Sequence, residues 1–227
     1  MKHAGIARRA ATKLIFLPLA AVLAVAVAGL LLGWPRWLAD VAAGLAILWL
    51  LFSGFTLYFF RDPVAQTPPD PGLAVSPAHG TVDAIEVLKE SPCFAGPCHR
   101  VSIFLSVINI HVQNAPVSGQ IAGLLHAPGQ FLSALKAESA LHNENILIQF
   151  ASSETPGETV GVRLIAGVLA RRIVPFVKEG DVLQRGERIS LIQFGSRCDL
   201  YLPMNFNIKV KLGDKVVGGE TTMAAKS

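Results

Sequence analysis

Two long runs of apolar residues stand at the start of the chain, before any shorter pattern begins. Residues 14–32 and 41–60 contain no lysine, arginine, aspartate or glutamate. About 20 apolar residues are enough for a helix to cross a hydrocarbon core about 30 Å thick. We therefore predict an N-terminal two-helix transmembrane hairpin, with residues 33–40 as its turn.

Beyond residue 62 the apolar runs become shorter and carry the pattern of β-strands. The stretches expected to form strands are rich in Val, Ile and Phe or alternate with polar residues; they are 101–112, 160–177 and 206–212. Tight turns are expected at three glycines, namely Gly180, Gly186 and Gly213. The best short helix is expected at 131–138. This pattern predicts a mainly β fold, β-sandwich or barrel-like, with few short helices.

The 101–112 stretch is apolar on both faces, which is typical of a central strand. Side chains alternate along a strand, so Asn109 and His111 are expected on one face. A proline-rich segment at 67–72 precedes all these strands and is unsuited to a helix. We therefore predict two parts: a membrane anchor at 1–62, with helices at about 14–32 and 41–60, and a β-rich domain at 63–227.

The charges are divided unevenly between these two parts. The formal net charge is +4, yet residues 61–227 hold 15 Lys/Arg and 15 Asp/Glu. A balanced folded domain argues against a nucleic-acid partner, which would require a basic patch. Four basic residues precede the first run and one lies in the turn, so the N-terminus is expected in the cytoplasm. Two crossings then place the β-rich domain on the cytoplasmic side of the cell's inner membrane. The alternative, a cleaved signal peptide, is less favoured because the first run is long and a second follows.

The cysteines do not form a recognisable metal motif. Cys93 and Cys98 are close in sequence and His99 follows, but Cys198 stands alone. A structural zinc site requires further ligands at a regular spacing, so no metal is predicted. A cytoplasmic setting also disfavours a disulfide, and inert thiols are expected.

One pair of residues between two strand-like runs could support covalent chemistry. Glycine permits close approach and unusual backbone angles, so the hydroxyl of Ser196 could attack the carbonyl of Gly195 in a strained turn. The resulting ester would eliminate to dehydroalanine and hydrolyse to a pyruvoyl group, with a base such as histidine moving the protons. Alone, a Gly-Ser pair is weak evidence, since most such pairs are ordinary turns.

Several short motifs follow one another in a fixed order along the chain: FFRDP at 59–63, VSPAHGTV at 75–82, SIFLS at 102–106, NIHV at 109–112, AP at 115–116, IQFGSR at 192–197 and DLYLP at 199–203. In this order and spacing they resemble a known family, the short phosphatidylserine decarboxylases, over most of residues 59–217. The agreement of several independent motifs makes the resemblance specific.

The resemblance implies an enzyme that matures by cutting itself between Gly195 and Ser196. It implies a β chain of residues 1–195 and an α chain of 196–227 that form a heterodimer, with a higher oligomer left open. Ser196 would become covalently bound pyruvate, the cofactor that withdraws electrons as CO₂ leaves. The substrate would be phosphatidylserine in the membrane, and the products phosphatidylethanolamine and CO₂.

Two histidines are implied as further catalytic residues. His111 matches the family's histidine in the Asn-x-His-Val segment and would be the base for self-cleavage. His79 stands where the family usually has the aspartate that orients this base, and a neutral imidazole cannot supply a fixed negative charge. Either His79 is itself a base, or Asp83 or Glu86 takes over, or maturation is slow. The alternative function is a catalytically inactive membrane-tethered β-domain that acts as a lipid or protein scaffold.

Overall fold

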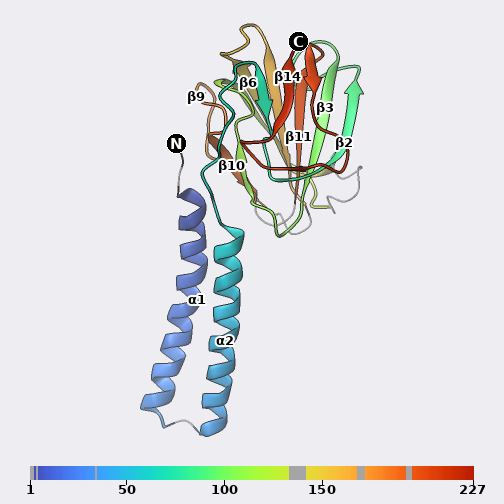
Figure 1. Cartoon of the computed structure of the whole chain (residues 1–227). Helices are drawn as coiled ribbons and strands as arrows, with labels where there is room; N and C mark the ends of the chain where they lie inside the picture. The colour runs from blue at the N-terminus through green and yellow to red at the C-terminus, as the bar shows by residue number, and fades with distance from the viewer. Residues whose placement is uncertain (1–2, 4, 34, 133–141, 168–171, 193–195) are drawn as a thin grey trace. The chain divides into compact units, whose positions relative to one another are not determined.

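The computed structural model describes residues 3, 5–33, 35–132, 142–167, 172–192 and 196–227. These fall into two compact units, one spanning Gly5–Asp62 and the other including Pro63–Ser227. Figure 1 shows the first as two helices and the second as a β-rich domain. Each unit is described by itself below.

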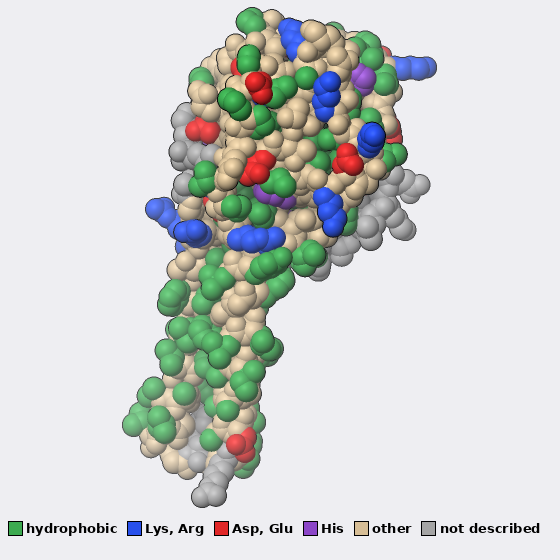
Figure 2. All heavy atoms as spheres, in the orientation of Figure 1, with side chains coloured by type: hydrophobic (Ala, Val, Ile, Leu, Met, Phe, Trp, Pro, Cys, Tyr) green, Lys and Arg blue, Asp and Glu red, His purple; other side chains and the backbone are tan. Residues whose placement is uncertain are grey.

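The N-terminal unit is a helical hairpin formed by α1 (Ile6–Leu31) and α2 (Arg36–Phe59). Both helices are long and apolar enough to cross a membrane, and hydrophobic side chains are spread along the face of the hairpin that Figure 2 shows. Each helix begins earlier than its apolar run, because alanine, arginine and lysine are good helix formers and continue a helix readily. The predicted turn at 33–40 is therefore wrong over 36–40, where extended Pro35 directly precedes α2.

A tryptophan of α2 bonds to the backbone of α1 near a proline. Pro18 has no N–H, so the carbonyl oxygen of Leu14, four residues before it, loses its usual helical donor. The indole Nε1 of Trp49 in α2 donates to the carbonyl oxygen of the next residue, Ile15, at 3.1 Å. This bond joins the two helices of the hairpin.

The described residues of the β-rich unit form three antiparallel sheets. The largest contains β2 (Gly80–Leu88), β3 (Cys98–Leu105), β5 (Gly119–Ala127), β6 (Asn145–Ser152), β7 (Thr159–Ile165), β9 (Val182–Leu183), β11 (Ser196–Pro203) and β13 (Lys215–Val216). Its strand order is β13-β2-β3-β11-β7-β6-β5-β9. The second sheet has β1 (Leu73–Val75), β14 (Thr222–Lys226) and β12 (Phe206–Ile208) in that order; the third has β4 (Val112–Asn114), β10 (Arg188–Ile192) and β8 (Ile173–Pro175). The mainly β fold with an N-terminal helical hairpin is thus confirmed.

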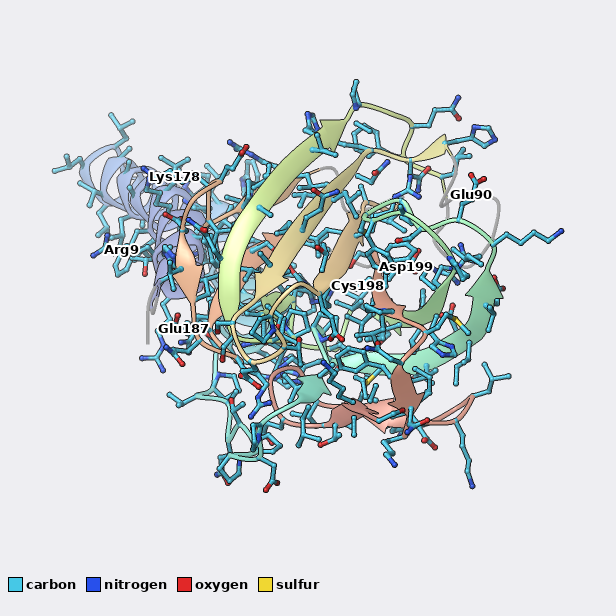
Figure 3. All side chains as sticks on the ribbon, turned by 90° about the horizontal axis from the view of Figure 1, so that it is seen from above. Arg9, Glu90, Lys178, Glu187, Cys198 and Asp199 are labelled. Carbon is cyan, nitrogen blue, oxygen red and sulfur yellow. The ribbon has the colours of Figure 1, made fainter. Side chains whose placement is uncertain are left out.

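The core lies between the large sheet and the two small ones. Along β11, alternate residues Cys198, Leu200 and Leu202 face this core, where Met223 of β14 and Ile189 of β10 also pack. The residues between them face the other side of the large sheet, so adjacent residues of β11 serve two different environments. Figure 3 labels one residue of each kind, Cys198 and Asp199.

The proline-rich segment before β1 is bound to the β-rich unit. Arg185 donates from Nη2 to the carbonyl oxygens of Pro68 and Asp70, both at 2.7 Å, and from Nη1 to that of Leu73 at 2.9 Å. Its ion pair with Glu154, at 3.0 Å, fixes the same guanidinium. The segment is non-helical as predicted, and one arginine holds it along the domain.

Local predictions in the β-rich unit have mixed outcomes. The turn glycines Gly180, Gly186 and Gly213 all have positive φ, at 88°, 81° and 88°. The predicted strand at 101–112 is wrong beyond Leu105, since residues 106–111 form a connection between β3 and β4. The helix expected at 131–138 falls largely on residues 133–141, outside the described part of the chain.

Candidate functional site

Ser196 is the first residue of β11 and is fully buried. It pairs with Leu105, the last residue of β3, in the antiparallel ladder between the two strands. Its hydroxyl has no hydrogen-bond partner among the residues that the structure describes. Gly195, the other predicted cleavage residue, lies just outside them. Burial without a partner is costly for a hydroxyl and marks Ser196 as a candidate reactive group.

His111 lies at the end of the connection that follows β3, and it too is fully buried. The connection is folded as a turn, in which the Asn109 N–H donates to the Ser106 carbonyl at 2.9 Å. The Asn109 side-chain oxygen accepts from the Ser106 N–H at 2.8 Å and from its hydroxyl at 2.7 Å. Asparagine and serine side chains compete with the sheet for backbone groups in this way, which explains why the strand ends at Leu105.

The residues on either side of 193–195 pair with residues at the two ends of this connection. Upstream, the Ile192 N–H donates to the carbonyl oxygen of His111 at 3.0 Å. Downstream, Ser196 pairs with Leu105. The predicted nucleophile and the predicted base therefore belong to segments that meet at one end of the large sheet.

His79 comes to the same end of the sheet. It precedes Gly80, where a Cβ atom would collide with the Phe104 carbonyl oxygen of β3. Only glycine therefore fits at position 80. In the next row, Thr81 of β2, Phe104 of β3 and Arg197 of β11 are register partners. The ring of His79 also lies against Gly218, in the part of the chain that follows Ser196.

The carboxylates considered as replacements for the missing aspartate are bound to arginines. Asp83 forms an ion pair with Arg197, and Glu86 forms one with Arg100. Both pairs lie on the face of the large sheet opposite the core. These contacts do not support the prediction that Asp83 or Glu86 orients His111.

A buried carboxyl, not singled out from the sequence, lies on the same face of the large sheet as these two ion pairs; together they are called the charged layer. Asp199 lies on β11 opposite Ser102 of β3, with a side chain almost fully buried. Burial raises the pKa of the Asp199 carboxyl, and the positive charges of Arg100 and Arg197 oppose that rise. Burial likewise raises the pKa of Asp83 against the opposing charge of Arg197. The layer therefore joins β11, immediately after Ser196, to β3 and β2.

The cysteines lie away from this end of the sheet or inside the core. Burial raises the pKa of the Cys93 thiol to about 12, and the pKa values of Cys98 and Cys198 also rise through burial. The Sγ of Cys93 occupies the space over Gly161 of β7. Among the described residues, no group of three or more His, Cys, Asp or Glu side chains is placed to hold a metal ion.

Comparison with known proteins decides the family. The model of the family described as phosphatidylserine decarboxylase matches residues 52–224. Two similar proteins are both named phosphatidylserine decarboxylase proenzyme. The one from Desulfotalea psychrophila is 39% identical over 197 residues, covering 85% of this chain and 91% of its own. The one from Erythrobacter litoralis is 40% identical over 216 residues, covering 89% and 83%.

The chain belongs to the phosphatidylserine decarboxylase family.

The family match confirms the resemblance found in the motifs and spans every candidate residue. His79, His111 and Ser196 all lie within it. Both relatives carry the word proenzyme in their names. The candidate cleavage point of this chain follows β10 and immediately precedes β11. The two apolar helices are consistent with association with a membrane.

Proposed function

We propose that this chain decarboxylates phosphatidylserine to phosphatidylethanolamine and CO₂, after cutting itself between Gly195 and Ser196. The single observation that carries the proposal is the buried hydroxyl of Ser196, without a partner among the described residues, at the first position of β11. The relatives' names, which state both the substrate and a proenzyme, support it.

Maturation begins with the Ser196 hydroxyl attacking the carbonyl carbon of Gly195. His111 accepts the hydroxyl proton and passes a proton to the nitrogen of Ser196 as the peptide bond breaks and an ester forms. Removal of the Ser196 α-proton then breaks the Cβ–Oγ bond and releases the carboxylate of Gly195. One water converts the remaining dehydroalanine into a pyruvoyl group and ammonia. His79 is a second candidate for moving these protons.

The residues present fit a pyruvoyl group at position 196. The side chain there lies in a space closed to solvent, and it makes no hydrogen bond to a described residue that conversion would break. When present, the group withdraws electrons from the bound serine headgroup as CO₂ leaves. His111 then returns a proton to the carbon that has lost CO₂.

The two chains made by cleavage stay together as a heterodimer. The α chain, residues 196–227, contributes β11 to the centre of the large sheet, between β3 and β7 of the β chain. It also contributes β13 beside β2, and β14 beside β1. Each α-chain strand named here is hydrogen-bonded to a strand of the β chain, so cleavage removes one peptide bond and leaves these ladders unchanged.

A hairpin in the membrane would bring the reaction to the bilayer that holds the substrate. Basic residues lie before the apolar run at 14–32, so we expect the N-terminus and the β-rich domain both to face the cytoplasm. A reporter fused after Ser227 should give a cytoplasmic signal, and one inserted between Leu31 and Arg36 should report the opposite side. Cytoplasmic signals from both positions would show that the hairpin does not cross.

Activity on lipid vesicles tests the proposed function. The purified full chain should release CO₂ from phosphatidylserine and should run as two chains on a denaturing gel. Ser196→Ala should remain one chain and release none, whereas Ser190→Ala, a change at another buried serine, should retain activity. Release of CO₂ by Ser196→Ala would refute the mechanism. An uncut wild type that binds vesicles without turnover would instead favour a scaffold.

A further inference from the structure

The turn before β4 is organised around one asparagine. Its backbone N–H, its side-chain oxygen and its carbonyl oxygen are all engaged, the first two by Ser106 and the last by His111. The carbonyl oxygen of Asn109 lies 2.8 Å from Nδ1 of His111. The asparagine thus connects the end of β3 to the imidazole that the proposed function uses as a base.

This contact determines which ring nitrogen carries the proton. A carbonyl oxygen can only accept a hydrogen bond, so Nδ1 of His111 must be the donor. In the neutral ring, Nε2 then carries the lone pair that can take a proton. In a serine–histidine–aspartate triad the same constraint on Nδ1 comes from a carboxylate. Here a main-chain carbonyl supplies it.

The main chain of His111 is fixed independently of its ring. Its carbonyl oxygen accepts from the Ile192 N–H at 3.0 Å and from Nε2 of Gln113 at 2.7 Å. The side-chain oxygen of Gln113 in turn accepts from the Ser190 hydroxyl at 2.6 Å. All of these groups are buried, so the base is held from the Asn109 side and from the β10 side.

We propose that Asn109 is a positioning residue for self-cleavage, which sets the tautomer of His111 through its carbonyl and takes the part of the family's aspartate. The inference rests on the proposed function, because it concerns the base of the cleavage reaction. It explains how a chain with His79 at the aspartate position still orients its histidine. The carbonyl orients the ring but, being neutral, stabilises the imidazolium less than a carboxylate does.

Substitutions at Asn109 distinguish the role of its side chain from the role of its carbonyl oxygen. Asn109→Ala removes the acceptor of two hydrogen bonds and releases the turn, and we expect self-cleavage to slow by about tenfold. Asn109→Asp retains an acceptor for both Ser106 groups and should cleave within about threefold of the wild-type rate. As a matched control, Asn205→Ala removes an asparagine from the turn between β11 and β12 and should leave the rate unchanged.

The direct readout is the protonation state of the imidazole nitrogens. The full-length Ser196→Ala chain, which cannot cleave, is labelled with ¹⁵N-histidine in detergent micelles, and the His111 signals are assigned by their loss in His111→Gln. At a pH where the ring is neutral, Nδ1 should be protonated and Nε2 should not. Asn109→Ala should mix the two tautomers, and Asn109→Asp should restore the single one.

The outcomes distinguish this inference from the proposed function. Protonation at Nε2, or Asn109→Ala cleaving slowly with an unchanged tautomer, would overturn the role of Asn109 while His111 remained the base. Normal cleavage by His111→Ala would overturn the proposed base and this inference together. A single Nδ1-protonated form that becomes mixed in Asn109→Ala, together with slower cleavage, supports both.

Discussion

Two buried serines lie on either side of the candidate cleavage point, and they differ in one respect. Ser190 on β10 donates its hydroxyl to Gln113 at 2.6 Å, whereas the hydroxyl of Ser196 on β11 has no partner among the described residues. Both side chains are fully buried. A buried hydroxyl without a hydrogen bond costs about 1–3 kcal/mol. The difference agrees with a stabilising role for Ser190 and with the reactive role that we propose for Ser196.

The strands that carry these serines also differ in their surroundings. β10 belongs to a three-stranded sheet between β4 and β8, and β11 lies near the middle of the eight-stranded sheet. The strands before and after the candidate cleavage point are therefore hydrogen-bonded within two different sheets. A cut between them need not disturb either sheet, which is what a precursor that remains folded after cleavage requires.

The largest effect is expected at His111, which contacts the β10 side through its backbone and follows the strand that pairs with Ser196. His111→Ala should slow self-cleavage by about 10²–10⁴-fold, because it would remove the proposed general base. His79→Ala should slow it less if His79 supports the reaction, and His79→Asp should mature at least as fast as wild type. The measurement is the cleaved fraction against time after synthesis. A His111→Ala chain that cleaves at the normal rate would contradict the role proposed for His111 next to Ser196.

The next effect concerns how firmly β11 is held after Ser196. Arg197→Met breaks a largely buried ion pair and should lower the free energy of unfolding by about 3 kcal/mol. Arg100→Met breaks the more exposed pair with Glu86 and should cost less than about 1 kcal/mol. Both are measured by denaturant unfolding of the uncleaved Ser196→Ala chain. Equal losses would show that the burial of the Arg197 pair is unimportant.

The loss of unfolding free energy in Arg197→Met should also depend on pH. Burial raises the pKa values of Asp83 and Asp199 in the folded chain, so the folded state binds their protons more readily than the unfolded state. Their favourable contribution is present at low pH and is lost as pH rises through the folded pKa values. A protonated Asp83 no longer attracts a guanidinium, so the deficit of Arg197→Met should shrink as pH falls, and the raised pKa places this change above the ordinary aspartate value of about 3.9. A deficit that stays constant until the pH reaches that ordinary value would contradict the raised pKa.

A smaller effect is expected at Ser190. Ser190→Ala leaves the side-chain oxygen of Gln113 without this donor and should lower the free energy of unfolding by about 1–2 kcal/mol. Self-cleavage should stay within about threefold of the wild-type rate, because the Gln113 amide still bonds to the His111 carbonyl. Loss of cleavage without loss of stability would mean that Ser190 takes part in the reaction.

The smallest effect is the slow reaction of the cysteines. A thiol pKa of about 12 leaves Cys93 almost entirely protonated near neutral pH, and the thiolate is the reactive form. The folded chain should take up iodoacetamide slowly at pH 7 and faster as the pH rises, whereas the denatured chain should react at all three cysteines. Mass spectrometry counts the adducts. Rapid labelling of folded chain at pH 7 would show that these thiols are accessible.

Local signals in the sequence predicted the hairpin, the β class and the glycine turns, since each depends on neighbouring residues. Ser196 and Gly195 were predicted from motifs rather than from geometry. The turn at 106–111 was missed because its apolar residues continue the strand pattern, while the bonds between Asn109 and Ser106 that end the strand have no periodic signature. The pairing of Arg197 with Asp83 depends on the register of three strands, which alternation alone does not determine.

The most direct test is the intact mass of the purified wild-type protein under denaturing conditions. We expect two polypeptides, one ending at Gly195 and one comprising residues 196–227, the second lighter by one ammonia than the same chain begun by serine. Ser190→Ala should give the same two masses, and Ser196→Ala only the full-length mass. A wild-type protein of full-length mass, or a short chain that begins with an unmodified serine, would contradict the conversion of Ser196.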